Sequence, residues 1–247
     1  MNEPSTRREA TRPGRLLIVA EPRDYADAWL LQQQLHAERV ADRRSDTLLL
    51  LQHHAVYTLG RRTLPAHLPQ GESALRATGA QVAVTNRGGS VTYHGPGQLV
   101  GYPVIRLSHS ASGPKQYVWL LEETLCRTLA HWGIEAHRIS KTPGLFVNVE
   151  GRTAKVASIG VRVEHGVTLH GFALNVDLDM TPFSRIIPCG LNSYRPTSMA
   201  ALCRSSVPIH QVARQVAEQF ALTFKLTWDL EALSGGTEFA EEHAHHA

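Results

Sequence analysis

The sequence predicts an α/β fold of the α+β kind, in which helices pack on a mixed β-sheet. Strand-like runs outnumber helical ones, and residues 144–179 are typical of consecutive strands with turns at Gly151 and Gly166. Two segments with helical periodicity, 114–133 and one that starts near Ser206, supply the packing layer. Because several strands follow one another without a helix between them, the pattern disfavours a regular β–α–β winding.

The first half of the chain predicts one helix among several strands. The helix covers residues 23–40, where Asp24 can cap the start and an apolar stripe recurs at helical spacing. Short apolar or alternating runs predict strands at residues 15–20, 46–53, 81–86 and 99–107. Gly101 and Pro103 mark the last of these as an irregular or edge strand.

The segment at 114–133 is the clearest helix. Pro114 suits its first turn, apolar residues recur at steps of three and four, and Gly133 can end it. Cys126 lies beside the apolar stripe and is expected to pack in the core or at its boundary. The final helix has Pro208 in its first turn and continues through residue 224.

The composition is that of a globular chain. The 247 residues are 43% hydrophobic and 19% charged, and they favour one domain over residues 15–233. Residues 1–14 and 234–247 are polar without periodicity and are expected to be disordered. The net charge of +3 is compatible with an acidic protein partner but is too small and dispersed to indicate nucleic acid.

The cysteine count and the lack of targeting signals predict a cytoplasmic protein. The 3 cysteines have no paired spacing, which argues against a disulfide framework and for a reducing compartment. No CxxC or HExxH pattern occurs, so we expect no metal site. The apolar run at 16–20 is too short for a signal peptide, and nothing approaches the roughly 18 apolar residues of a membrane helix. We therefore expect no membrane association.

One stretch is unusually rich in glycine. RGGSVTYHGPGQLVGYP, residues 87–103, is either a tight turn between strands or a loop whose backbone closely approaches a ligand. It matches neither a phosphate-binding P-loop nor a dinucleotide-binding fingerprint, because the required lysine and glycine spacings are missing.

Two further residues are chemically conspicuous. Cys189 lies between Pro188 and Gly190, on a predicted turn where the thiol is either accessible or a small buried group. Lys155 lies in the apolar run TAKVASIG, where it is either solvated or held inward for a purpose. Regular alternation along a strand places Lys155 on the same face as Ala157 and Ile159, opposite Val156 and Ser158.

Together these stretches resemble the lipoyl(octanoyl) transferase family. The glycine-rich string at 87–103 is followed in order by GLFV, AKVASIG, LHGFALNVD, PCG and TSM, and VYTLGRR precedes it. The resemblance covers roughly residues 15–233. The glycine-rich string is its most specific part, and LHGFALN and PCG strengthen it.

The resemblance implies a biotin/lipoyl protein ligase-like fold and an acyl transfer. Members of the family take octanoyl from octanoyl-acyl carrier protein and attach it to one lysine of a lipoyl domain. Their acceptors include the lipoyl domains of 2-oxoacid dehydrogenase complexes and the H protein of glycine cleavage. Because the amide product is more stable than the thioester donor, neither ATP nor a cofactor is expected.

The resemblance also implies the site residues. Cys189 corresponds to the cysteine that forms the acyl-thioester intermediate, and Lys155 to the lysine that lowers the pKa of that thiol. The implied substrate-binding residues are Arg87, Gly88, Gly89, Ser90, Val91, Thr92, Tyr93, His94, Ser158, Ile159, Gly160, Gly171, Phe172 and Ala173. His94 is open to two interpretations, either as a helper in proton transfer or as a residue that orients the glycine-rich loop.

Three other functions remain open from the sequence. An ATP-dependent lipoate or biotin ligase shares the fold but needs no nucleophilic cysteine. A non-catalytic protein that binds acyl carrier or lipoyl domains would not depend on Cys189 and Lys155. A thioesterase would release free octanoate to water without an acceptor domain.

Overall fold

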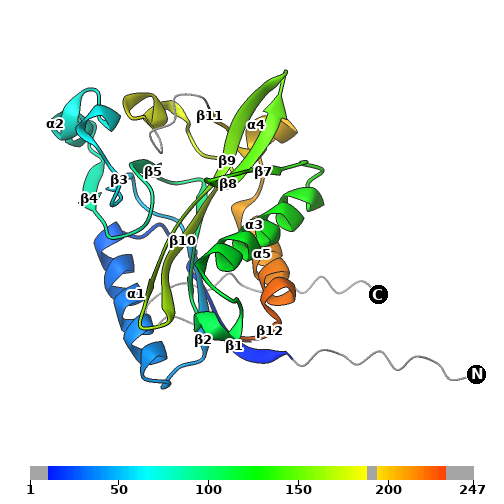
Figure 1. The fold of residues 1–247 in the computed structure, drawn as a ribbon. Coiled ribbons are helices and arrows are strands. Elements are labelled where there is room, and N and C mark those ends of the chain that lie inside the picture. Colours follow the sequence, from blue (N-terminus) through cyan, green and yellow to red (C-terminus); the bar gives the residue numbers. More distant parts are fainter. Residues whose placement is uncertain (1–10, 188–193, 232–247) are drawn as a thin grey trace, which may run out of the picture.

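The computed structural model describes residues 11–187 and 194–231 (Figure 1). Across the large sheet the strands follow in the order β12 (Leu226–Leu230), β1 (Arg12–Ile18), β2 (Asp46–Leu51), β6 (Gln98–Val104), β10 (Val167–Asn175), β9 (Arg152–Glu164), β8 (Thr142–Val149) and β7 (His137–Ile139). The short β11 (Arg195–Pro196) pairs with β9. β1 is parallel to both of its neighbours, whereas β2, β6, β10, β9 and β8 are successively antiparallel. The predicted mixed sheet is therefore confirmed.

A second, smaller sheet lies at one end of the first. Its strands are β4 (Gln81–Val84), β3 (Val56–Leu59) and β5 (Thr92–His94), in that order. The helices are α1 (Tyr25–Val40), α2 (Gly71–Arg76), α3 (Pro114–His131), α4 (Met199–Cys203) and α5 (Ile209–Phe224), with 3₁₀ turns η1 (Pro65–His67), η2 (Leu107–His109) and η3 (Thr181–Arg185). The helices predicted at 23–40, at 114–133 and after Ser206 are confirmed. Among the described residues, no helix is long and apolar enough to cross a membrane.

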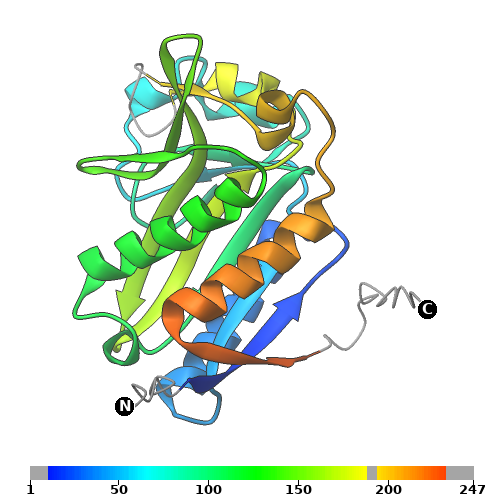
Figure 2. The same ribbon diagram turned by 90° about the vertical axis from the view of Figure 1, so that its right-hand side faces the viewer.

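The large sheet has a helical layer on each face. α3 and α5 lie side by side on one face (Figure 2), and α1 covers the other (Figure 1). β2 shows why both faces are apolar: Leu48 and Leu50 join the cluster under α3 and α5, whereas Leu49 and Leu51 join the cluster under α1. A strand that is buried on both sides requires such a continuous apolar run.

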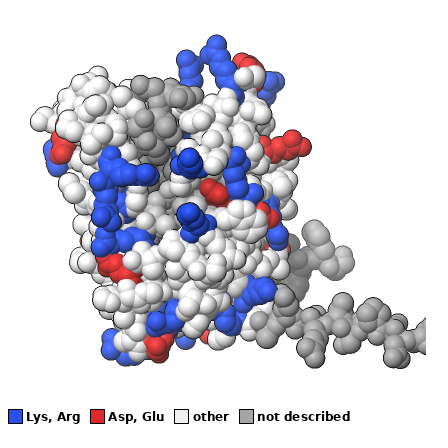
Figure 3. Space-filling view, viewed as in Figure 1, with Lys and Arg blue, Asp and Glu red and all other residues white. Residues whose placement is uncertain are grey.

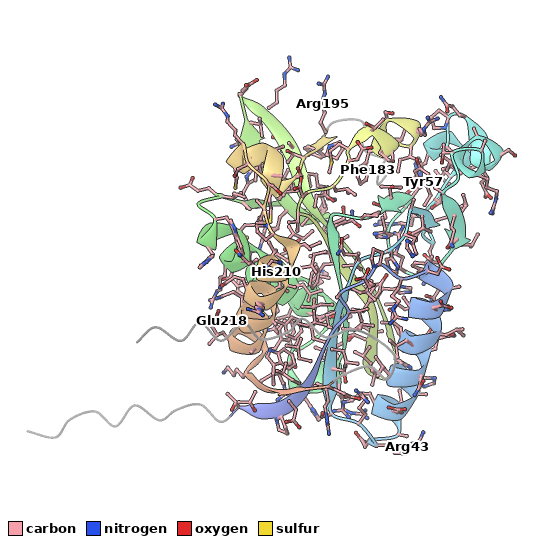
Figure 4. All side chains as sticks on the ribbon, turned by 180° about the vertical axis from the view of Figure 1, so that it is seen from behind. Arg43, Tyr57, Phe183, Arg195, His210 and Glu218 are labelled. Carbon is pink, nitrogen blue, oxygen red and sulfur yellow. The ribbon has the colours of Figure 1, made fainter. Side chains whose placement is uncertain are left out.

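A third apolar cluster joins the small sheet to η3. The Tyr93 ring lies 5.1 Å from the Tyr57 ring and 5.8 Å from the Phe183 ring, measured between centroids. The Tyr57 hydroxyl donates to the carbonyl of Pro182 at 3.1 Å. Tyr57 and Phe183 lie together at the upper end of the molecule, and Arg195 lies at the same end (Figure 4). This cluster anchors the small sheet independently of the two larger clusters.

Two details differ from the sequence-based predictions. Residues 12–14 were expected in the disordered N-terminal segment, but they belong to β1 because they pair with β12. The strand with Gly101 and Pro103 was expected as an irregular or edge strand, but β6 lies centrally between β2 and β10. Pairing of β6 with β10 ends at Gly101, and beyond it the Thr168 hydroxyl donates to the Pro103 carbonyl at 2.7 Å. The proline is thus irregular within a central strand.

Candidate functional site

The glycine-rich loop is fixed by the guanidinium of Arg87. Arg87 Nη2 donates to the carbonyl of Thr58 at 2.6 Å and to its hydroxyl at 2.8 Å. The amide of Gly88 donates to Val161 on β9 at 3.2 Å, so the loop spans from the small sheet to the large one. Gly89 has a φ of +86°, a backbone conformation that residues other than glycine rarely adopt. The loop therefore closes over the space between β9 and β5.

A cavity lies beneath this loop. Its lining comes from the loop, β5, β6, β9, β10 and the first turn of α1, and consists of Tyr25, Arg87, Gly88, Gly89, Thr92, His94, Val100, Tyr102, Ser158, Ile159, Gly160, His170, Gly171, Phe172 and Ala173. The register of the central strands explains the meeting of two predicted segments, since Ser158 pairs with Ala173 and Gly160 with Gly171. The three predicted substrate segments therefore converge on one cavity.

Three of the predicted substrate residues do not line the cavity. Side chains alternate along β5, so Thr92 and His94 face the cavity whereas Val91 and Tyr93 face the third apolar cluster. Ser90 lies 2.6 Å from a ring nitrogen of His67 in η1. These three residues hold the loop in place, and a direct contact between them and substrate stays a prediction.

Two buried histidines, His94 and His170, line the cavity, and a third, His53, lies against His94 with 5.7 Å between the ring centroids. Burial lowers the pKa of His94 to about 3, and electrostatic repulsion from the neighbouring His53 is the second cause of this lowering. Burial likewise lowers the pKa of His53 to about 4 and that of His170 to about 3. His170 stacks on the Trp29 ring at 4.9 Å and lies 2.6 Å from the side-chain oxygen of Asn86. At neutral pH these imidazoles hold residues in place without adding charge.

A chain of hydrogen bonds leads inward from Arg87. The Thr58 hydroxyl accepts from Arg87 and lies 3.2 Å from Nε2 of His94. Gln98 donates to the side-chain oxygen of Asn175 at 2.9 Å, and Asn175 donates to the carbonyl of Thr197 at 2.9 Å. The role of His94 as an orienting residue agrees with this position, because both of its ring nitrogens have partners.

Lys155 faces the opposite side of β9 from the one predicted. Val156 is an extra residue in a β-bulge, since Leu145 pairs with Ala157 while Phe146 pairs with Lys155. Val156 and Ala157 therefore both join the core under α3 and α5, together with Ile159. Lys155 alternates with Ala154 and Val156 of that core, so it lies on the same face as Ser158. The expected sharing of a face with Ala157 and Ile159 is wrong, because the bulge interrupts strict alternation.

The ammonium of Lys155 is held within the protein. Nζ donates to the carbonyl of Pro143 at 3.0 Å and lies 5.1 Å from the centre of the Phe146 ring. The Phe146 ring also meets that of Tyr194 at 4.8 Å. Pro196 of β11 pairs with Lys155, and the amide of Thr197 donates to the Lys155 carbonyl at 2.9 Å. The lysine predicted to be catalytic is therefore half-buried and oriented.

Cys189, with Pro188 and Gly190, lies outside the described residues. The described residues on either side both adjoin the site. Ile187 donates its amide to the carbonyl of His67, the residue that contacts Ser90. On the other side, Tyr194 meets Phe146 next to Lys155.

Sequence reasoning missed several residues of the site. Tyr25, Val100, Tyr102 and His170 line the cavity, and Thr58 and Gln98 position its polar groups. Gln98 and Tyr102 lie within the conspicuous glycine-rich string, and His170 lies within LHGFALN, so the motifs themselves carried that signal. Nothing in the local sequence distinguished Tyr25 from an ordinary apolar position on α1.

The arrangement suits a mainly apolar acyl group bound close to a cation. The walls contain glycine, alanine, valine and aromatic residues, and Arg87 lies at the loop. Apolar walls favour burial of hydrocarbon, whereas cationic groups stabilise a thiolate or the oxygen of an acyl group. Among the described residues, no group of three or more His, Cys, Asp or Glu side chains is placed to hold a metal ion.

Comparison with known proteins identifies the family of this chain. The family model described as the lipoyl protein ligase A/B catalytic domain matches residues 24–221. A curated octanoyltransferase from Chloroflexus aggregans is 41% identical over 204 residues, which cover 82% of this chain and 91% of that protein. A second, from Mycobacterium ulcerans, is 45% identical over 200 residues, covering 79% and 82%.

Solved structures share the fold at much lower identity. A bipartite lipoate protein ligase from Thermoplasma acidophilum superposes with a TM-score of 0.67 at 16% identity, covering 91% of this chain and 88% of that one. The biotin protein ligase of Aquifex aeolicus gives a TM-score of 0.53 at 14% identity, covering 85% and 70%. The predicted biotin/lipoyl ligase-like fold is confirmed.

Proposed function

We propose that this chain, which belongs to the lipoyl protein ligase A/B catalytic domain family, is an octanoyltransferase of protein lipoylation. The observation that carries the proposal is the convergence of the three motif segments on one cavity, lined by Ser158 on the same face of β9 as Lys155. Relatives named octanoyltransferase are more than 40% identical over most of the chain, far above the identity to any ligase structure described above.

The proposed reaction has two acyl transfers. In the first, the Cys189 thiolate attacks the carbonyl of octanoyl-acyl carrier protein, and the phosphopantetheine thiolate leaves. In the second, the neutral amine of a lipoyl-domain lysine attacks the Cys189 thioester, the carbon–sulfur bond breaks, and the proton that the nitrogen loses as the amide forms passes to the departing Cys189 sulfur. The 2-oxoacid dehydrogenase lipoyl domains and the glycine cleavage H protein are the proposed acceptors.

Lys155 is the proposed cation beside the thiolate. An ammonium group within hydrogen-bond reach stabilises the charged form of a thiol and so increases the fraction that can attack. In this proposal Lys155 also handles the proton that the acceptor amine must lose, by relay through Cys189: the departing sulfur accepts that proton, and the ammonium beside it stabilises the sulfur until it does. Its fixed contact with Pro143 supports this role, because a mobile surface lysine would not hold a constant geometry.

The cavity is the proposed binding site of the octanoyl chain. Burying a methylene is worth about 0.8 kcal/mol, so the methylenes of octanoyl supply roughly 5 kcal/mol in total. Basic side chains gather along one side of the face drawn in Figure 3 and at the tip of the β8–β9 hairpin. This distribution supports an acidic carrier protein as the donor.

We place the reaction in the cytoplasm, in keeping with the free thiols of Cys126 and Cys203.

The test mixes the protein with octanoyl-acyl carrier protein in the absence of ATP and measures the intact mass. We expect an octanoyl adduct on the unmodified chain and on a Cys203→Ala control, but none on Cys189→Ala. Adding a lipoyl domain should discharge the adduct and increase the mass of the domain by one octanoyl group.

The competing functions give different outcomes in the same assay. A requirement for ATP and free octanoate would identify a ligase. Free octanoate released without a lipoyl domain would identify a thioesterase. Binding of the donor without any transfer would identify a non-catalytic carrier-binding protein.

A further inference from the structure

Glu122 of α3 is a buried carboxylate that the proposed reaction does not use. Its residue is only 7% exposed, although it lies on a helix that also carries the half-exposed Trp119. Oε1 accepts the amide hydrogen of Gly144 at 3.0 Å, and Oε2 lies 3.4 Å from Nε of Arg138 on β7. Burying a carboxylate is costly unless its oxygens find partners, so a function should accompany this placement.

A single peptide group connects Glu122 to Lys155. The carbonyl of Pro143 accepts from Lys155 Nζ at 3.0 Å, and the amide of Gly144, which belongs to the same planar peptide, donates to Glu122 at 3.0 Å. Hydrogen bonds at the two ends of one peptide strengthen each other through polarisation. The carboxylate therefore makes this carbonyl a better acceptor for the ammonium.

The backbone at Gly144 is specific to this arrangement. Its φ of +121° lies where glycine is favoured, and a Cβ there would lie 2.3 Å from the carbonyl oxygen of Ala157 and 2.9 Å from Cε of Lys155. Gly144 pairs with Ser158, and the bulge at Val156 follows close by, where it shifts the pairing of β8 with β9 between Leu145 and Phe146. The glycine and the bulge together turn the Pro143–Gly144 peptide so that it points toward α3 at one end and toward Lys155 at the other.

We propose that Glu122 is a positioning residue for Lys155, acting through the Pro143–Gly144 peptide. The proposal rests on the role of Lys155 given above and adds a residue that acts on Lys155 without touching the reacting groups. α3 packs on one face of the sheet, whereas the cavity residues Val100, Tyr102 and Ala173 belong to the cluster on the other face, so the peptide carries the influence of the carboxylate through the sheet. Without Glu122 the amide of Gly144 loses its acceptor, and the ammonium loses a fixed partner.

Within residues 11–187 and 194–231, the charged groups near this link each have a defined place. Arg138 lies against Glu122 from β7, and Lys155 acts on it from β9 through its charge alone. On α3 itself, Glu123 pairs with Arg127 and Arg138, and the Cys126 thiol lies near both glutamates. The matched control is Glu123→Ala. It removes one carboxylate from the same helix and from the same arginine but leaves the bond to Gly144 in place.

The test measures the rate at which iodoacetamide alkylates Cys189 as a function of pH, followed on the Cys189 peptide by mass spectrometry. This readout needs no acyl donor. In Lys155→Met we expect the midpoint of the alkylation profile to rise by about one unit or more. In Glu122→Ala it should rise most of the way to the Lys155→Met value, whereas Glu122→Gln, which retains an acceptor oxygen, and Glu123→Ala should stay near the unmodified protein.

The double variant separates positioning from general stability. If Glu122 acts through Lys155, adding Glu122→Ala to Lys155→Met should move the midpoint no further. A lower melting temperature with an unchanged midpoint in Glu122→Ala would overturn the inference, because Glu122 would then be only structural. An unchanged midpoint in Lys155→Met itself would instead contradict the proposed role of Lys155.

Discussion

His94 and Gln98 are joined by a 2.7 Å hydrogen bond between the ring Nδ1 and the side-chain oxygen. Gln98 uses its amino group to donate to the Tyr93 carbonyl and to Asn175, so its oxygen is the atom that faces the imidazole. This orientation assigns the ring proton of His94 to Nδ1 and leaves Nε2 to accept from the Thr58 hydroxyl. A second proton on this ring would have no acceptor, which agrees with a neutral histidine.

The neutral histidines predict steep loss of stability in acid. His53, His94 and His170 have folded-state pKa values lowered to about 4, 3 and 3. Below the unfolded value of about 6.5, the unfolded chain binds these protons and the folded chain does not, so stability falls as the pH falls. Between about pH 5.5 and 4.5 the three groups together remove about 4 kcal/mol per pH unit.

Urea unfolding at a series of pH values measures this slope. His94→Gln should reduce the slope by about a third, because one of the three protons is no longer taken up. A pH-independent free energy of unfolding between pH 6.5 and 4.5 would show that these histidines are protonated in the folded state.

The tight packing of Gly160 against the glycine-rich loop predicts that Gly160→Ala slows acyl loading more than it lowers stability. A Cβ at Gly160 would lie 2.8 Å from the carbonyl of Gly88, so Gly160→Ala must displace the glycine-rich loop. We expect at least a tenfold slower formation of the octanoyl adduct, with the melting temperature lowered by only a few degrees. Gly113→Ala is the control, because nothing lies within 4 Å of a Cβ there. Normal loading by Gly160→Ala would show that the loop position is unimportant.

The sequence predicted the positions of most elements but not the geometry around Lys155. Apolar periodicity located α1, α3, α5 and the long strands because each buries one face or both. The bulge at Val156 left no local signal, since TAKVAS is consistent with an unbroken strand, and it reversed the face on which Lys155 lies. Likewise, the burial of Glu122 depends on β8, which is distant in sequence from α3.

The motif segments were predicted better than their individual roles. The family resemblance implied that segments of β9 and β10 join the glycine-rich loop at one site, and the strand register does bring these segments together. The sequence did not separate Thr92 and His94, which line the cavity, from Val91 and Tyr93, which pack in the third cluster. That division depends on where the small sheet docks, which local patterns do not encode.

The position of Ala173 in the cavity wall predicts that a larger side chain there changes the preferred length of the acyl chain. Its methyl group lines the cavity and is 5% exposed, opposite Ser158 in the neighbouring strand. Ala173→Leu adds bulk to the wall, so octanoyl should load more slowly while a four-carbon chain is less affected. The ratio of the two loading rates should shift by about 10- to 200-fold toward the shorter chain. Equal slowing of both chains would place Ala173 away from the hydrocarbon.

Asn175 connects the buried polar chain to the strand beside Lys155, because it accepts from Gln98 and donates to the carbonyl of Thr197. Asn175→Ala removes this acceptor from one amino hydrogen of Gln98 and this donor from the Thr197 carbonyl, which costs about 1–3 kcal/mol of folding free energy. It should also loosen β11 from β9, so we expect slower acyl transfer with little change in the KM for the donor. Asn148→Ala, at an exposed position of β8, is the control and should match the unmodified protein in both measurements. Loss of stability without slower transfer would mean that Asn175 supports the fold and not the site.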